Sequence, residues 1–266
     1  MGLLKTIFIG GILSLNGKCF AFSPQPTETV VLLHGIINRP FMMYKIKKAL
    51  EKNGFRVLNW GYKSTQKSIE DHAKDLQRFV ENEKIEGQIH FVGFSLGAII
   101  ARCYLVTAPP PHVGRFVQIA PPNHGSPVVN HYDHFPPFRW IYGDKAIQQL
   151  RDGGDFLKSL GVPSCEWGII VGGTGTSQGP SRQILGDNDG SVGLESSLVP
   201  ESKDWVQIKS QHTGLLFKKE VGLQLVSFLK NGVFFKKETA TTRDVSFFRC
   251  NPSGYETPDQ FLRRGQ

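Results

Sequence analysis

The strongest chemical signal in this sequence is the pentapeptide Gly93-Phe94-Ser95-Leu96-Gly97. It lies between an apolar run at residues 89–92 and a second one at residues 98–106, which continues at helical spacing. A serine at a sharp strand-to-helix turn needs strained backbone angles, and glycines two residues away on either side relieve the crowding. The hydroxyl then projects over a helix N-terminus, which favours developing negative charge. The pattern predicts that Ser95 is a nucleophile for acyl transfer; the alternative is a glycine-rich turn that happens to carry a serine.

A nucleophilic serine needs a base, and the base needs an acid that orients it. The turn-rich segment at residues 186–192 contains two candidate acids, Asp187 and Asp189. His212 comes later in the chain, shortly after a strand pattern at residues 205–208. Serine, acid and histidine in this order are expected for hydrolases that use this serine turn.

The loop after the first strand pattern supplies a further feature that acyl transfer needs. Residues 30–33 are apolar and run into His34-Gly35-Ile36-Ile37-Asn38. A loop at this place can aim a second backbone N–H at the reacting oxygen and complete an oxyanion hole.

Five stretches, taken in order, resemble the α/β-hydrolase superfamily and, within it, small bacterial lipases and esterases. They span Val30 to about Leu229 and read VVLLHGI, GFSLGAIIAR, APPNHGS, GDNDGSV and QHTGLL. Matched by position, the resemblance implies that Ser95 is the nucleophile, Asp189 the acid and His212 the base. It also implies that the backbone N–H groups of Ile36 and Leu96 form the oxyanion hole.

The resemblance assigns structural roles to two other residues near these motifs. His34 corresponds to a loop-organising histidine and not to the catalytic base. The acid is the aspartate that opens an Asp-x-x-Val pattern, which here is Asp189 to Val192. Asp187 then falls at a turn position, where an Asp side chain can hold the turn through hydrogen bonds to the backbone.

The activity implied by the resemblance is hydrolysis of a small-molecule or lipid ester, with a lipid or medium-chain acyl ester as the expected substrate. An acyltransferase, thioesterase or amidase can use the same triad, and a catalytically inactive binding protein can share the fold. These alternatives stay open from the sequence.

No cofactor or metal is expected, because three superficially suggestive segments lack required residues. The glycine run at 172–179 has Gln178 where a dinucleotide motif needs glycine. The acid loop has Leu185 where a calcium loop needs an oxygen ligand, and Ser196 where it needs a glutamate. His131 and His134, with Asp133 between them, have no third ligand at a defined spacing.

The length of 266 residues allows one large domain. Six apolar strand patterns lie at residues 29–33, 55–59, 88–92, 115–119, 167–172 and 204–209. Helical patterns alternate with them at residues 40–53, 68–84, 96–107 and 214–230. Strands that are apolar throughout are typical of a parallel sheet covered on both faces. The expected fold is therefore α/β: a mostly parallel sheet of about six strands, flanked by helices on both faces.

The predicted helix at residues 68–84 shows the pattern most clearly. Ser68 can cap its N-terminus through Asp71, three residues further on. Its apolar face consists of Ile69, Ala73, Leu76 and Val80.

An aromatic and proline-rich insert at about residues 127–165 separates two of the strand patterns. Its bulky side chains are Phe135, Phe138, Trp140 and Tyr142. In one interpretation the insert is a lid or pocket wall that offers apolar surface to an acyl chain. In the other, these side chains only pin a long loop to the core.

The predicted hydrolase domain covers residues 24–235. Residues 1–23 resemble a secretory signal peptide, with Lys5 before an apolar run and small residues before Pro24. This predicts a secreted or periplasmic protein; an uncleaved membrane anchor is the alternative. Residues 236–266 lie beyond the resemblance and are interpreted as a C-terminal appendage.

Cysteine usage and charge add two weaker expectations. Cleavage after Ser23 leaves Cys103 as an expected buried thiol and keeps Cys165 and Cys250, whose pairing is left open. The net charge of +8 becomes +6 when the two leader lysines are removed. Salt-sensitive peripheral association with anionic membranes is a hypothesis, supported by the lysine pairs at 218–219 and 236–237. Nucleic-acid binding is not expected, and nothing indicates an oligomeric state.

Overall fold

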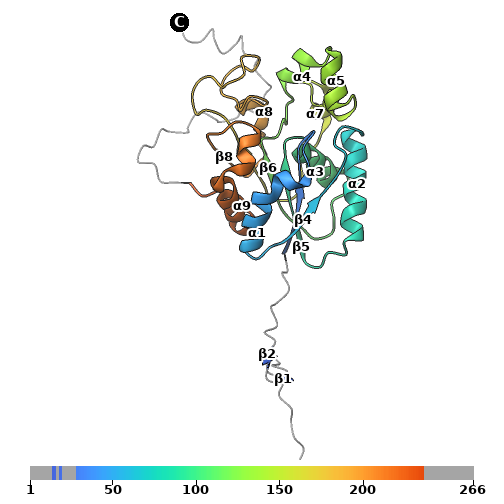
Figure 1. The fold of residues 1–266 in the computed structure, drawn as a ribbon, viewed down its shortest axis with the longest axis vertical. Coiled ribbons are helices and arrows are strands. Elements are labelled where there is room, and N and C mark those ends of the chain that lie inside the picture. Colours follow the sequence, from blue (N-terminus) through green and yellow to red (C-terminus); the bar gives the residue numbers. More distant parts are fainter. Residues whose placement is uncertain (1–13, 16–17, 20–27, 237–266) are drawn as a thin grey trace, which may run out of the picture. The chain divides into compact units, whose positions relative to one another are not determined.

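The computed structural model describes residues 14–15, 18–19 and 28–236 (Figure 1). Within residues 28–236, the main sheet has six strands in the order β4-β3-β5-β6-β7-β8, and each neighbouring pair is parallel. The strands are β3 (Glu28–Leu33), β4 (Arg56–Trp60), β5 (Gln88–Phe94), β6 (Val113–Ile119), β7 (Trp167–Val171) and β8 (Asp204–Gln207). The predicted α/β class and the six parallel strands are confirmed.

The strand order creates a crevice between β3 and β5. From β3 the chain winds outward to β4, then crosses back over β3 to β5 and continues in the opposite direction along the sheet. Loops that leave the carboxyl ends of strands on either side of such a switch point diverge, and ligands of open parallel sheets bind there. The loop at residues 34–38 follows β3, and Ser95 follows β5. The topology therefore brings these two predicted site segments together.

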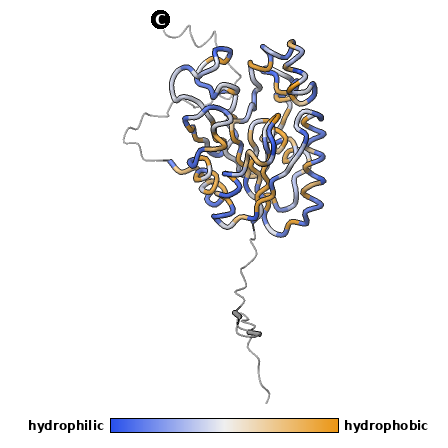
Figure 2. The backbone as a smooth tube through the Cα atoms, in the orientation of Figure 1, coloured by the Kyte–Doolittle hydropathy of each residue, from blue (hydrophilic) through white to orange (hydrophobic). Residues whose placement is uncertain are grey.

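Helices cover both faces of the sheet (Figure 1). α1 (Tyr44–Lys52) packs beside α9 (Lys219–Asn231) on one face, and α2 (Ile69–Asn82) packs beside α3 (Leu96–Thr107) on the other. Alternate strand residues enter the two cores: Val31 and Leu33 face α2 and α3, and Val30 and Leu32 face α1 and α9. The central strands are accordingly the most hydrophobic part of the chain trace (Figure 2).

Two predicted helices are each interrupted near their start. The helical pattern at residues 40–53 is a 3-10 helix, η1 (Pro40–Met43), followed by α1. The pattern at residues 214–230 is a second 3-10 helix, η2 (Thr213–Phe217), followed by α9. Lys218 between η2 and α9 has an extended backbone, which breaks the helical run.

The insert contains the short helices α4 (Pro127–Tyr132), α5 (Pro136–Tyr142), α6 (Ala146–Gln149) and α7 (Asp155–Ser159). Another short helix, α8 (Leu194–Ser197), follows later in the chain. At the N-terminus, β1 (Ser14–Leu15) pairs antiparallel with β2 (Lys18–Cys19). The rest of the predicted signal peptide and nearly all of the C-terminal appendage lie outside the described residues. Within the described ranges, no helix is both long and apolar enough to cross a lipid bilayer.

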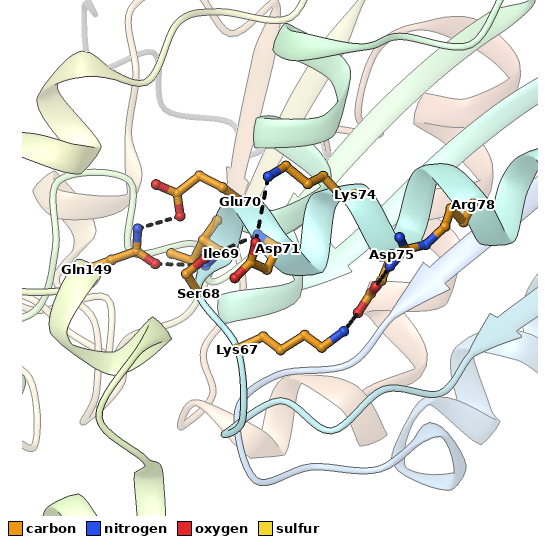
Figure 3. A network of polar contacts seen from close by, with 9 residues as sticks. All are labelled: Lys67, Ser68, Ile69, Glu70, Asp71, Lys74, Asp75, Arg78 and Gln149. Atoms are coloured by element: carbon orange, nitrogen blue, oxygen red, sulfur yellow. Dashed lines mark hydrogen bonds and ion pairs between the residues drawn. The ribbon is translucent and has the colours of Figure 1, made fainter.

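The insert is fastened to the start of α2 by Gln149 (Figure 3). The first N–H groups of a helix have no intrahelical acceptors. Gln149 accepts a hydrogen bond from the Ile69 N–H at 2.7 Å and donates one to Glu70 at 2.6 Å. Ser68 Oγ accepts from the Asp71 N–H at 3.2 Å, so the predicted helix cap is confirmed. Gln149 therefore replaces a missing helix partner while it holds the insert in place.

Three histidines, His34, His72 and His90, are buried in this domain. His90 in β5 is fully buried, and its Nδ1 accepts the Arg115 N–H at 2.8 Å. Burial, together with the positive charge of Arg115, lowers the pKa of His90 to about 4. Burial also lowers the pKa of His34 and of His72.

We expect the domain to lose stability as the pH falls from about 6.5 toward 4. A histidine whose folded-state pKa is lowered stays neutral when folded but binds a proton when unfolded. Its stabilisation is therefore complete above the unfolded pKa and is lost on the way down to the folded one. For His90, the difference between 6.5 and about 4 corresponds to about 3 kcal/mol.

Urea unfolding of wild type and His90→Gln at pH 7 and at pH 4 measures this loss. The variant should lose less free energy of unfolding between the two pH values than the wild type. His112→Gln, at an exposed position, serves as the control and should behave like the wild type. An equal pH dependence in wild type and His90→Gln would contradict the expectation.

Candidate active site

Ser95 occupies the predicted strained turn between β5 and α3. Its backbone angles are φ 54° and ψ −122°, which are unusual for any residue other than glycine. A Cβ atom on Gly93 would lie 2.4 Å from Ala98 Cα, and one on Gly97 would lie 2.5 Å from the His34 carbonyl oxygen. Both glycines are therefore required by close backbone packing. Strain of this kind costs on the order of 1–3 kcal/mol and persists only where the surrounding structure enforces it.

His212 and Asp189 form the closest acid–base pair at this edge of the sheet. His212 Nδ1 lies 2.7 Å from Asp189 Oδ2. The backbone N–H of His212 also donates to the backbone carbonyl oxygen of Asp189 at 2.9 Å. The other carboxylate oxygen, Oδ1, accepts the N–H groups of Ser191 and Val192 at 2.9 and 2.8 Å. Asp189 is buried, so its carboxylate is held in one orientation and fixes the imidazole ring.

The histidine ring lies beside the serine turn. The rings of His212 and Phe94 have their centres 4.8 Å apart, and Phe94 directly precedes Ser95. Ser95 and His212 also line one pocket. Among the described residues, Ser95 Oγ forms no hydrogen bond with His212. In enzymes without substrate this bond is often long and tightens when the substrate binds. The structure thus brings the three predicted residues to one place.

The two predicted oxyanion donors come from the loops on either side of the crevice. Leu96 is the first residue of α3, so no helical carbonyl accepts its N–H. Ile36 follows β3 and lines the same pocket as Ser95. The next residue, Ile37, has a positive φ of 51° and donates its N–H to Ser64 Oγ at 3.0 Å. This bond fixes the course of the loop and leaves the Ile36 N–H without a partner in the described structure.

His34 is buried beneath this loop and does not line the pocket. Its ring stacks on Tyr62 with centres 4.3 Å apart, and Nδ1 lies 2.8 Å from the Gly35 carbonyl oxygen. The Tyr62 hydroxyl donates to the His34 carbonyl oxygen at 2.5 Å. These contacts agree with a loop-organising role for His34.

Asp187 does more than hold its own turn. Its carboxylate accepts hydrogen bonds from the N–H groups of Thr174 and Gly175, both at 2.8 Å, and from Gln207 Nε2 at 2.6 Å. The Thr174 hydroxyl is a further donor at 2.9 Å. Burial alone would raise the pKa of Asp187, but these hydrogen bonds lower it overall. Asp187 therefore joins the glycine-rich segment after β7 to β8, a connection that the sequence did not reveal.

A mainly apolar pocket of about 180 Å³ opens in front of Ser95. The insert provides much of its wall through Val129, Phe138, Tyr142, Ile147 and Leu150. Phe138 and Tyr142 stack with ring centres 4.4 Å apart. Phe135 and Trp140 instead are exposed by 53% and 87%. Phe138 and Tyr142, two of the four predicted aromatic residues, thus form part of the pocket wall. The aliphatic wall residues were not identified from the sequence, because nothing in their spacing distinguishes them from core residues.

A second, more polar cavity of about 490 Å³ also reaches His212. The two cavities share Val128, Ser191, His212 and Thr213, but Ser95 lines only the first. Polar side chains of the second cavity include Gln183 and Gln211, and its lining holds no lysine or arginine. A group placed there would reach the histidine from a polar surrounding.

A buried polar network supports α3 behind the serine turn. Arg102 donates to Asn123 Oδ1 at 3.1 Å and to the carbonyl oxygens of Leu160 and Gly161 at 2.7 and 2.9 Å. Asn123 in turn donates to Gln118 Oε1 at 2.8 Å. Burial lowers the pKa of Arg102. The network joins α3 to β6 and to the end of the insert; the signal for it in the sequence is an arginine inside an apolar helical run.

The cysteines agree with structural roles where they are described. Cys103 is buried in α3, as predicted, and burial raises its pKa to about 11. Cys165 is half-buried, and burial raises its pKa to about 11 as well. Cys250 lies outside the described residues, so its pairing with Cys165 stays an open prediction.

Comparison with known proteins agrees with this architecture. A family model of the alpha/beta hydrolase fold matches residues 28–153. The mature lipase BlEst2 of Bacillus licheniformis is 18% identical, with a TM-score of 0.60 over 78% of this chain and 92% of the lipase. The esterase EaEST from Exiguobacterium antarcticum is 16% identical, with a TM-score of 0.55 over 76% of this chain and 92% of the esterase.

A third similar structure is the metagenomic carboxyl esterase MGS0156, which is 14% identical with a TM-score of 0.59. The match covers 78% of this chain and 71% of that esterase. A search of curated protein sequences finds no match. The chain therefore has the α/β-hydrolase fold, as its motifs predicted, and resembles bacterial lipases and esterases in structure. At these identities the likeness is one of fold.

Proposed function

We propose that this protein is a serine hydrolase that cleaves carboxylic esters. The observation that carries the proposal is the 2.7 Å contact between His212 Nδ1 and Asp189 Oδ2, beside a serine with strained backbone angles in the same pocket. A buried carboxylate bonded to Nδ1 sets the imidazole tautomer that leaves Nε2 free to accept a proton. Ser95 is then the nucleophile, His212 the base and Asp189 the acid.

The reaction proceeds in two acyl transfers. Ser95 Oγ attacks the ester carbonyl carbon while His212 Nε2 takes the serine proton, and Asp189 stabilises the imidazolium. The N–H groups of Ile36 and Leu96 donate to the oxyanion. The carbon–oxygen bond to the alcohol breaks as His212 returns the proton to that oxygen. His212 then takes a proton from a water molecule, which attacks the acyl-enzyme. This step releases the carboxylic acid product and returns the proton to Ser95.

The two cavities suggest where the acyl chain and the alcohol part of the ester bind. The apolar pocket in front of Ser95 suits the acyl chain, since its wall is aliphatic and aromatic. The polar cavity beside His212 suits the leaving alcohol, because that oxygen must receive its proton from the histidine. The apolar pocket, at about 180 Å³, is below the usual range for drug-sized ligands, which favours short and medium acyl chains over long ones.

Hydrolysis of a series of p-nitrophenyl esters with one alcohol tests the proposal. Acetate, butyrate, octanoate and palmitate esters vary only the acyl chain, and kcat/KM should be highest for butyrate or octanoate. Val129→Phe places a larger side chain in the pocket wall and should move the preference toward acetate. Absence of hydrolysis across the series would contradict the ester-hydrolase proposal, and the highest kcat/KM with palmitate would contradict the acyl assignment.

A further inference from the structure

A line of exposed aromatic and basic side chains runs along η1 and α1. It consists of Phe41, Tyr44, Lys45, Lys48 and Lys52, which recur at helical spacing. Phe41 is exposed by 69% and Tyr44 by 58%. The opposite side of the same segment, including Met43, Ile46 and Leu50, is buried in the core. The core therefore does not require the outward aromatic rings.

The end of η2 and the start of α9 extend this line into a surface. Phe217 is exposed by 45%, and Lys45 Nζ lies 5.5 Å from the centre of its ring. Lys48 Nζ lies 5.7 Å from the centre of the Tyr44 ring. Lys218 and Lys219 follow Phe217 and are exposed. We call this surface the basic aromatic face: Phe41, Tyr44, Phe217, Lys45, Lys48, Lys52, Lys218 and Lys219.

The charge of the basic aromatic face is largely uncompensated. The acidic residues on the same elements are Glu51 and Glu220, and Glu51 pairs with Lys47 at 3.6 Å. In the described structure, no carboxylate lies within ion-pairing distance of the face's five lysines. A second copy of the chain related by a two-fold axis would place these lysines against one another, which is unfavourable. An anionic partner is favoured instead.

The face begins at the mouth of the acyl pocket. Ile37 lines that pocket, is exposed by 49%, and lies three positions before Pro40, the first residue of η1. Thr213 also lines the pocket and is the first residue of η2. Both arms of the face therefore extend from residues that touch the proposed substrate site.

We propose that the basic aromatic face docks on the surface of an anionic lipid bilayer. The aromatic rings enter the headgroup region, where amphipathic rings are favoured, and the lysines contact lipid phosphates. Each lysine near an anionic membrane strengthens binding roughly fivefold. Docking in this way brings the mouth of the acyl pocket to the lipid surface. The docking itself does not depend on the ester-hydrolase proposal, since binding is measured without turnover.

Co-sedimentation of the full chain with sucrose-loaded vesicles tests the proposal. Vesicles of phosphatidylglycerol with phosphatidylcholine should bind the protein at low salt and release it at high salt, and vesicles of phosphatidylcholine alone should bind much less. The double variant Lys45→Glu/Lys48→Glu should weaken binding by roughly tenfold or more. Phe41→Ser/Phe217→Ser should weaken binding at low salt without a change of charge. The N-terminal apolar run is present in every protein compared and so cannot cause a difference.

The matched control is Lys74→Glu/Lys84→Glu, which makes the same charge change on and just after α2, on the other face of the sheet. This control should bind as the wild type does. Equal binding of the wild type, the lysine face variant and the control, or equal loss in the control and the face variant, would overturn the proposal. Salt-insensitive binding to phosphatidylcholine alone, or a wild-type dimer that dissociates in the face variants, would overturn it as well. Circular dichroism spectra that match the wild type show that the variants are folded, whatever their activity.

Discussion

Ser95→Ala should lower kcat for ester hydrolysis by on the order of a thousandfold or more and leave the fold intact. The serine stands at a turn whose backbone is fixed by Gly93, Gly97 and the surrounding packing, so the hydroxyl itself supports little structure. Alanine retains the Cβ atom and the same backbone angles. What is lost is the oxygen that attacks the carbonyl in the proposed reaction.

The measurement compares kcat on one soluble ester with the circular dichroism spectra of the proteins. Ser191→Ala is the matched control, because Ser191 lines the same pocket and its role at Asp189 is carried by its backbone N–H. The control should keep most of the activity. A folded Ser95→Ala protein with near wild-type kcat would refute the assignment of the nucleophile.

Asp189→Asn should reduce kcat by a factor approaching ~10⁴. The carboxylate accepts from His212 Nδ1 at 2.7 Å and from two backbone N–H groups. An amide has no negative charge to stabilise the imidazolium, and it can present an N–H to the ring and so favour the wrong tautomer. The loss is expected in kcat, since neither effect requires the substrate to bind more weakly.

Asp187→Asn provides the discriminating comparison, two residues away in the same loop. Its carboxylate accepts four hydrogen bonds from Thr174, Gly175 and Gln207, and none from His212. The amide retains only part of this acceptor capacity, so the variant should lose stability and keep most of its kcat. Urea unfolding and kcat measured on both variants separate the two effects. A larger loss of kcat in folded Asp187→Asn than in Asp189→Asn would move the acid to position 187.

The sequence predicted the type of most secondary-structure elements because their signals are local. Fully apolar strands indicate burial on both faces, and the spacing of Ile69, Ala73, Leu76 and Val80 indicates a helix with one buried side. The glycines at 93 and 97 predicted the serine turn because a strained turn crowds the positions two residues away, and in the structure a Cβ atom at either position would clash with the backbone. The candidate residues could be named from motifs, since their order along the chain is distinctive.

The features that the sequence missed depend on contacts between distant segments. The strand order that places the β3 loop beside Ser95 leaves no trace in hydropathy. The bonds from Gln149 to the start of α2, and from Asp187 to Thr174 and Gln207, join residues that no local pattern connects. Lys218 interrupts a continuous helical pattern between η2 and α9. Helical periodicity is preserved across such a break, so the pattern alone gives one helix.

Covalent labelling by a fluorophosphonate tests the central claim most directly, because the probe reacts with an activated serine whatever the natural ester is. We predict that the folded wild-type protein gains one probe adduct, that peptide mapping places the adduct on Ser95, and that Ser95→Ala is not labelled. His212→Ala should be labelled far more slowly, since the serine then lacks its base. A folded wild-type protein that takes up no probe, or one labelled on a different serine, would contradict the account.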